Sequence, residues 1–320
     1  MLRIRALPGT ALIGLLLFTS CATEPGSRES ALPTGVEAIS LLGDTLRAPP
    51  LDSAVAAQRE EALATARSAL AVTPDDADSV IWLGRRLAYL GRYREAIDIY
   101  TQGVATHPDD ARLYRHRGHR YITTRQFELA VGDLVRASGL VAGQPDRVEP
   151  DGIPNALGIP TSTLHTNVWY HLGLAHYLRG DFERAASAYR ECLRAAANPD
   201  MTVATSHWLY MTLRRLGRAD EAAAVLDPIR ADWDVIENHE YHRLLLMYKG
   251  ELDPDSLLDD AAAADGIGSA TTAYGVANWH YYNGRDARAS QLFRTILEGA
   301  QWPAFGYVAA EAEVARVSDR

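Results

Sequence analysis

Small and apolar residues recur along most of this chain at the spacing of one helix face. In the segment that begins at Ala77 they stand at positions i, i+3, i+4 and i+7, as Val80, Leu83, Gly84 and Leu87. This spacing places them together on one side of a helix. Gly91 then provides a left-handed helix end, and a second periodic segment runs from there to Pro108, which stops it. The pattern therefore predicts two helices joined by a tight turn.

This pair of segments is repeated along the chain. Aligned glycines end the first segment of five pairs: Gly91, Gly180, Gly217, Gly250 and Gly284. The intervals between them are 89, 37, 33 and 34 residues, and the first interval contains two periods of 34 and an insertion of 21. In the pair before the insertion, Arg125 occupies the glycine position. A period near 34 residues predicts an array of about six helix hairpins.

The first hairpin resembles the tetratricopeptide repeat at its small, aromatic and proline positions: Leu83, Gly84, Tyr93, Ala96, Tyr100 and Pro108. The resemblance covers roughly residues 51 to 317. It implies an all-α fold, a right-handed superhelical solenoid of about six repeat units with a C-terminal capping helix. We expect this cap from Ala304 to Arg316. A helix from Ala54 to Ala71 is expected to be the second half of a degenerate first unit.

Five regions are predicted along the chain. They are a signal peptide at 1–20, a flexible tether at 21–50, N-terminal repeat units at 51–140, an insertion rich in proline and glycine at 141–165, and C-terminal repeat units with the capping helix at 166–320. The tether is expected to be flexible because Pro, Gly, Ser and Thr are frequent in it.

The first twenty-one residues have the pattern of an export signal. Arg3 and Arg5 precede an apolar stretch at 11–18, which is too short to span a membrane, and small residues then lead to Cys21. This resembles the lipobox of bacterial lipoproteins. The resemblance implies lipidation at Cys21 and anchoring in the outer membrane, facing the periplasm. Cleavage after Ala22 and plain secretion is the alternative.

Charge and motifs argue against several classes of function. The formal net charge is −9 and Lys249 is the single lysine, which disfavours nucleic-acid binding. The histidines lack the spacing of metal ligands, and the sequence has no nucleophile elbow, phosphate loop or dinucleotide fingerprint. Cys192 falls at a small-residue position of a second helix, where a buried, unreactive thiol is expected. We therefore predict no enzyme activity, no metal site and no cofactor.

In tetratricopeptide arrays the first helices line a concave groove, and the resemblance implies which side chains face it here. The N-terminal units contribute Arg85, Tyr89, Arg112, Arg115 and His119. The C-terminal units contribute Asn167, Tyr170, Tyr177, His207, Tyr274, Asn278 and Tyr281. Arginine and tyrosine are prominent in this set, and they are the residue types that contribute most to binding interfaces. Packing of these side chains between helices is the alternative.

These features predict a membrane-anchored adaptor that binds a protein partner through an acidic or C-terminal peptide segment. Arg115, His119 and Asn167 resemble the residues with which some family members hold a terminal carboxylate. A sensor or carrier of a small anionic ligand is the alternative function. An enzyme with its site under the insertion is the least favoured of the three.

The insertion is expected to be ordered, because its prolines lower the entropy lost on ordering. It contains four apolar residues that would be unfavourable in water: Ile153, Leu157, Ile159 and Leu164. We expect it to pack across the mouth of the groove near Arg115, His119 and Tyr170. A loop on the outer surface is the alternative.

Overall fold

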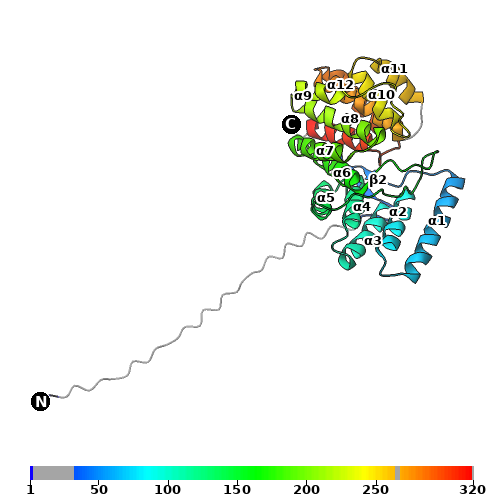
Figure 1. Ribbon diagram of the computed structural model, residues 1–320, viewed down its shortest axis with the longest axis vertical. Helices are drawn as coiled ribbons and strands as arrows, with labels where there is room; N and C mark the ends of the chain where they lie inside the picture. Colours follow the sequence, from blue (N-terminus) through cyan, green and yellow to red (C-terminus); the bar gives the residue numbers. More distant parts are fainter. Residues whose placement is uncertain (3–31, 264–266, 319–320) are drawn as a thin grey trace. The chain divides into compact units, whose positions relative to one another are not determined.

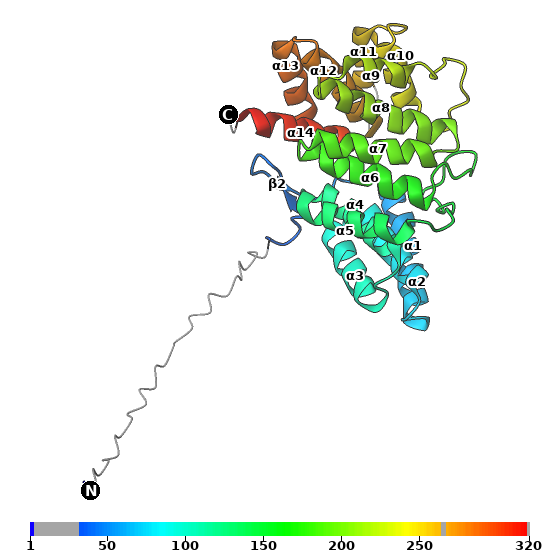
Figure 2. The ribbon, with the colours of Figure 1, turned by 60° about the vertical axis from the view of Figure 1, so that its left-hand side comes forward.

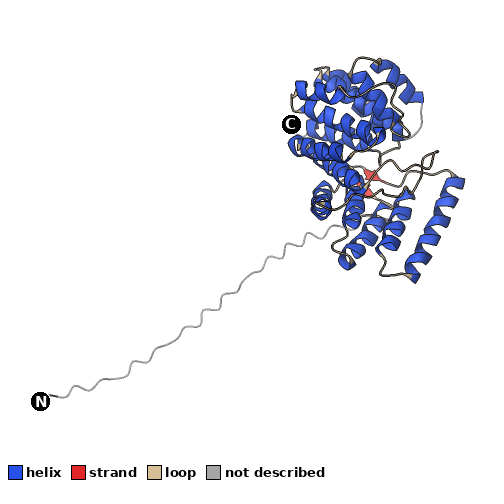
Figure 3. Ribbon diagram, viewed as in Figure 1, coloured by secondary structure: helices blue, strands red, loops and turns tan. Residues whose placement is uncertain are grey.

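The computed structural model of the protein describes residues 1–2, 32–263 and 267–318. The described residues from Pro33 onward form one compact unit. The expected signal peptide and Cys21 lie outside the described residues. Within the described part the fold is almost entirely helical, with one short pair of strands (Figure 3).

Six helix hairpins follow one another along the chain (Figure 1). Their first helices are α2 (Ala77–Tyr89), α4 (Ala111–Thr123), α6 (Leu164–Leu178), α8 (Pro199–Arg215), α10 (His239–Tyr248) and α12 (Ile267–Tyr282). Their second helices are α3 (Tyr93–Thr106), α5 (Phe127–Val141), α7 (Phe182–Ala195), α9 (Ala219–Leu226), α11 (Pro254–Ala263) and α13 (Asp286–Leu297). A single helix, α1 (Ser53–Val72), precedes them, and α14 (Phe305–Ser318) follows. The all-α solenoid of about six units with an end helix is thus confirmed.

Local chemistry sets the ends and the spacing of the hairpins. Gly91 has a φ of +76°, a conformation that glycine adopts without a steric penalty. Arg125 takes the same position in the second hairpin, and among the described residues it is the only non-glycine with a positive φ, +65°. Inside the third hairpin, a Cβ on Gly173 would lie 2.6 Å from Cε1 of Tyr189. Only glycine allows α6 and α7 to approach this closely.

The expectation of a flexible tether is wrong for residues 33–50. Here β1 (Ala38–Ile39) pairs with β2 (Thr45–Leu46) in an antiparallel hairpin. Val36, Ala38 and Leu46 are buried, and the indole Nε1 of Trp302 donates to the carbonyl of Arg47 at 2.6 Å. Composition suggested flexibility, but three apolar side chains in this short segment find a place in the core.

The C-terminal helix α14 packs against α12 and α13 and also contacts α6 (Figure 2). A buried ion pair then joins it to the turn after α4, where Arg125 Nη2 lies 2.7 Å from Glu311 Oε2. The same guanidinium donates to the carbonyl of Trp302 at 3.0 Å, and Glu311 Oε1 accepts from the backbone N–H of Leu41 at 2.7 Å. One carboxylate therefore joins three segments that are far apart in the sequence.

Candidate functional site

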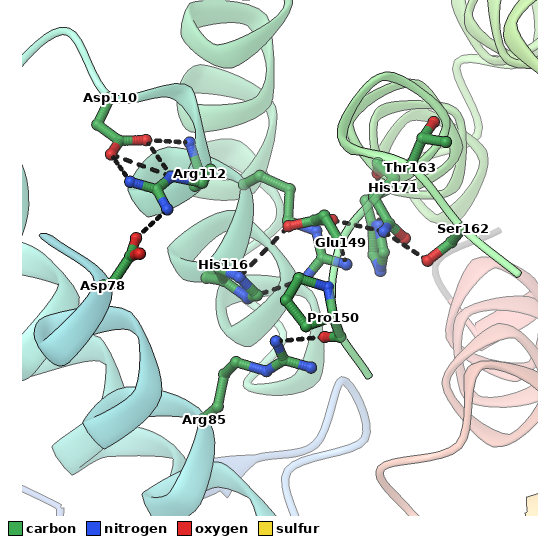
Figure 4. Close-up of polar contacts among 12 residues, drawn as sticks. Asp78, Arg85, Asp110, Arg112, His116, Glu149, Pro150, Ser162, Thr163 and His171 are labelled. Atoms are coloured by element: carbon green, nitrogen blue, oxygen red, sulfur yellow. Dashed lines mark hydrogen bonds and ion pairs between the residues drawn. The ribbon is translucent and has the colours of Figure 1, made fainter. Parts of the chain in front are cut away.

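The inner side of the N-terminal repeats, α2 to α5, is where the arginines expected in the groove meet the insertion. Arg115 on α4 reaches Glu149 of the insertion, with Nη2 3.1 Å from Oε2 (Figure 4). Arg85 on α2 donates from Nη1 to the carbonyl of Pro150 at 2.8 Å and from Nε to the hydroxyl of Tyr89 at 3.2 Å. The insertion thus contacts Arg115, one of the three residues near which it was expected, whereas His119 and Tyr170 contact His171, Phe305 and Tyr241.

Glu149 is the centre of this site, and its side chain is only 8% exposed. Asn167, at the start of α6, donates from Nδ2 to Glu149 Oε2 at 2.5 Å and to Ser162 Oγ at 2.9 Å. The other carboxylate oxygen, Oε1, lies 3.6 Å from Nε2 of His116. A buried carboxylate needs such partners, because losing its hydration is unfavourable.

The protonation of His116 follows from its neighbours. Burial first, and then the charge of Arg115, hold the pKa of His116 well below its ordinary value. Arg115 Nη1 lies 2.8 Å from His116 Nδ1, and arginine can only donate, so Nδ1 accepts. The ring proton of the neutral histidine therefore sits on Nε2, on the side of Glu149.

A short hairpin-like segment, which we call the strap (residues 148–163), carries Glu149. Its ends are joined by an antiparallel bridge between Val148 and Thr163. Besides Arg85, Arg86 also binds it, donating from Nη1 to the carbonyl of Gly152 at 3.0 Å. On the opposite side, Asn198 donates from Nδ2 to the carbonyl of Thr161 at 2.8 Å. The strap thus spans from α2 to the residue before α8.

The apolar residues of the insertion are placed differently from the expectation. Leu164 is buried, but Ile153, Leu157 and Ile159 are 58%, 66% and 50% exposed. Their burial is therefore not what orders the strap. Polar contacts hold it, including two hydrogen bonds from the backbone N–H groups of Leu157 and Ile159 to Asn155 Oδ1.

Two other predicted groove residues of the N-terminal units lie away from Glu149. Arg112 pairs with Asp110, 2.5 Å from Nη2 to Oδ2, and with Asp78 (Figure 4). It lines a separate cavity of about 830 Å³ near the start of α4. His119 stacks near His171 and Phe305, with ring centroids 4.3 and 5.3 Å away. The carboxylate-binding set is therefore Arg115, His116 and Asn167 rather than Arg115, His119 and Asn167.

The prediction that side chains of the C-terminal repeats line an open groove is wrong for most of the residues named. The first helices α6, α8, α10 and α12 meet each other there, so their inward side chains form a core. Tyr177, His207, Tyr274 and Asn278 are 0% exposed, and Tyr170 is 7% exposed. The hydroxyls of Tyr177 and Tyr274 lie 2.8 Å apart, and that of Tyr170 lies 3.1 Å from the hydroxyl of Tyr241.

Tyr281, the last of this group, is half-buried under Arg215, whose guanidinium carbon lies 4.4 Å from the ring centroid. Arg215 in turn pairs with Glu313 of α14 at 2.6 Å. An open groove lined by the C-terminal repeats is therefore absent from the described part of the chain. Helix packing, the alternative weighed above, accounts for these side chains.

Sequence reasoning missed four residues of the site, one of which is Arg86, which donates to the carbonyl of Gly152. His116 and Glu149 acquire their roles only through the contact between α4 and the strap. Arg120, one helical turn after His116, has its guanidinium 5.5 Å from the ring centroid of Tyr93, and no carboxylate of the described residues lies within ion-pair distance. Burial lowers the pKa of Arg120. The sequence did contain one indication of this site, because α4 has an arginine in every helical turn.

Cys192 behaves as expected from its position in the repeat. It is 0% exposed, and burial raises the pKa of its thiol to about 12. At neutral pH it is therefore a protonated, unreactive thiol. No group of three or more metal-ligating side chains is found in residues 32–263 and 267–318. The helices described there include none that is both long and apolar enough to cross a membrane.

Comparison with known proteins agrees with the repeat architecture. Family models described as "Tetratricopeptide repeat" match residues 51–111, 83–145 and 166–199. Residues 146–165, most of the insertion, lie between the last two of these matches. The chain therefore carries tetratricopeptide repeats, and arrays of such repeats generally act as non-enzymatic scaffolds for protein interaction.

Solved structures with a similar arrangement of helices include those of two named proteins. MamA is 15% identical, the match covers 62% of this chain and 87% of MamA, and the TM-score is 0.41. YrrB, described as "a TPR protein with an unusual peptide-binding site", is 13% identical, with 73% and 91% of the two chains covered and a TM-score of 0.41. Among curated proteins, a sequence search finds no match.

Proposed function

We propose that this protein is an adaptor whose N-terminal repeats bind a partner protein through an acidic peptide segment or a C-terminal carboxylate. The observation that carries the proposal is the carboxylate of Glu149, held by Arg115 and Asn167 at 3.1 and 2.5 Å. Charge-assisted hydrogen bonds of this kind are the strong ones in proteins, and they select carboxylates over neutral groups.

The surroundings of this set favour a peptide over a small anion. Arg85 and Arg86 donate to two main-chain carbonyls, of Pro150 and Gly152, next to the bound carboxylate. Main-chain acceptors at such positions are a property of an extended polypeptide. Arg120 adds positive charge without a paired carboxylate among the described residues, which further favours an acidic partner.

Binding of acidic synthetic peptides, with free and with amidated C-termini, tests the proposal. Arg115→Gln should weaken the affinity about tenfold to a hundredfold, because a hydrogen bond to a charged group is lost. Arg136→Gln is the matched control, since Arg136 is 50% exposed and pairs with Asp109, outside the set that holds Glu149. Equal affinities for both variants would contradict the proposal. Binding of small dicarboxylates in preference to every peptide would favour the sensor or carrier instead.

We further propose that the adaptor is anchored to the outer membrane by lipid on Cys21 and faces the periplasm. Support comes from the sequence alone, namely the short apolar stretch at 11–18 followed by small residues and cysteine. Cys21→Ala should release the protein from the membrane fraction or leave it unprocessed. Membrane partition and processing unchanged by this substitution would refute the anchor.

A further inference from the structure

The contacts of the strap with α2 and α4 use chemical groups that any extended acidic peptide has. Within four consecutive residues, Glu149 to Gly152, the repeats bind one carboxylate and two main-chain carbonyls. Figure 4 shows the Pro150 carbonyl pointing toward Arg85 and the Glu149 carboxylate lying near His116. Pro150, which directly follows Glu149, has no backbone N–H, so the repeats need not supply a hydrogen-bond acceptor at that position.

The fourth position of this segment accepts only a very small residue. A Cβ built on Gly152 would lie 2.6 Å from Cζ of Tyr89, whose hydroxyl is held by Arg85. A side chain there would push away the tyrosine and the arginine that bind the segment. The site therefore selects for two features: a carboxylate at the first position and glycine at the fourth.

The start of α6 keeps contacts that do not involve residues 149–161 of the strap. The start of α6 is fixed independently, because Thr163 caps it in a reciprocal capping box with Thr166. Asp146, before the strap, accepts from the Thr163 hydroxyl at 2.6 Å and from the backbone N–H of His165 at 3.0 Å. These contacts remain if residues 149–161 move, and the exposed side chains of Ile153, Leu157 and Ile159 bury little against the repeats.

We propose that residues Glu149–Gly152 are an intramolecular copy of the ligand, so that a partner segment of the form Glu-x-x-Gly binds by displacing the strap. This inference rests on the proposed function, since it assumes that a partner peptide uses the Arg115 site. When Glu149 leaves, Arg115 loses its carboxylate partner, and an incoming carboxylate takes the place of Glu149. Arg120, which has no ion-pair partner among the described residues even when the strap is in place, adds positive charge nearby. While the strap occupies the Arg115 site, a partner peptide cannot bind there. The apparent affinity of the protein for the peptide is therefore the intrinsic affinity multiplied by the fraction of molecules in which the strap is open.

The probe for this competition is the strap sequence itself, residues 147–152, as the peptide fluoresceinyl-Arg-Val-Glu-Pro-Asp-Gly-amide, with the dye on the N-terminal nitrogen. Its binding to the purified full chain is followed by fluorescence polarisation. Glu149→Gln should tighten binding at least about tenfold, because the strap loses its charge-assisted contacts while the site keeps its own. Peptides with Gln for Glu, or Val for Gly, should bind at least about tenfold more weakly to this variant.

Two further variants keep the test independent of folding defects. Asn155→Ala removes contacts that organise the strap, namely its bonds to Ile159 and Glu237, without touching the Arg115 set, and it should also tighten binding. Glu128→Gln changes an exposed carboxylate on α5 that pairs with Arg179, and it should leave binding unchanged.

The outcomes separate the two proposals. Equal affinities of the wild-type chain and both strap variants for the probe would overturn the displacement, while the proposed function would stand. If other acidic peptides bind in an Arg115-dependent way but the probe binds no variant, the Glu-x-x-Gly ligand is wrong. Loss of Arg115 dependence for every peptide would overturn the proposed function itself.

Discussion

The N-terminal repeats (α2 to α5) and the C-terminal repeats (α6 to α13) use the same hairpin but treat their inner faces differently. In both, a first-helix glycine lies against a second-helix tyrosine, Gly84 on Tyr100 and Gly173 on Tyr189. The inner face of the N-terminal repeats keeps arginines that bind the strap. That of the C-terminal repeats is closed, with Tyr177 and Tyr274 in mutual contact.

The difference shows that separate positions of the repeat determine the hairpin and the character of its inner face. The small and aromatic residues between the two helices of a hairpin fix the hairpin, and they are alike in both regions. The inner positions are free to vary, and they become a core wherever the first helices of different units meet. The role of an inner position therefore depends on which helices pack opposite it as well as on its place in the repeat.

The largest expected effect concerns the ion pair that joins α14 to the N-terminal region. Arg125 and Glu311 have side-chain exposures of 3% and 1%, and Arg125→Met leaves Glu311 buried without its partner. We expect the free energy of unfolding to fall by about 3–5 kcal/mol. Urea denaturation followed by circular dichroism measures this.

The double variant Arg125→Met/Glu311→Met should recover part of that loss, because no unpaired charge remains. Arg136→Met, which breaks a surface pair with Asp109, should change stability by less than about 1 kcal/mol. A loss for Arg125→Met as small as that for Arg136→Met would mean that the pair does not hold the two regions together.

A second prediction compares two helical glycines, one in each region. Gly173→Ala should destabilise the protein by about 1–3 kcal/mol, because the new methyl group meets the ring of Tyr189. Gly132→Ala on α5 has nothing within 4 Å of the added carbon and should stabilise by about 0.5–1 kcal/mol, as alanine favours the helix. Thermal and urea unfolding of both variants test this. Effects of the same sign would refute the argument from close approach.

The third prediction concerns pH and the closed region. Burial lowers the pKa of His207 to about 3, whereas in the unfolded chain it is about 6.5. Between these values the unfolded state binds a proton that the folded state does not, so stability decreases as the pH falls below about 6.5. The contribution is up to about 1.4 kcal/mol per pH unit.

His207→Gln should remove this part of the pH dependence, measured as urea unfolding at pH 7 and pH 5. The exposed His239 provides the control, since His239→Gln should leave the dependence unchanged. If His207→Gln and wild type lose the same stability on acidification, His207 is not responsible.

The smallest expected effect is on the strap. Leu157 is 66% exposed, so Leu157→Ser should change the free energy of unfolding by no more than about 0.5 kcal/mol. A loss above 1.5 kcal/mol in urea denaturation would show that the strap is held by apolar burial and not by its polar contacts.

Local patterns were enough to predict the hairpins, their glycine turns, the single helix before them and the helix after them. Expected bounds of Ala54–Ala71 and Ala304–Arg316 compare with Ser53–Val72 and Phe305–Ser318 in the structure. This works because a helix pair depends on contacts within about 34 residues, and those contacts repeat. The repeat alignment also predicted that Arg125 lies at a left-handed turn, because it occupies the position that is glycine in the other five hairpins.

What each inner face does was decided only by contacts between distant segments. Glu149 meets Arg115 from 34 positions away, and Glu311 meets Arg125 from 186 positions away. The sequence by itself determined the repeats and the arginine and tyrosine side chains that point inward. The tertiary structure decided which of them bind a carboxylate and which are buried, because the helices packed opposite each position and the path of the strap control both desolvation and charge pairing.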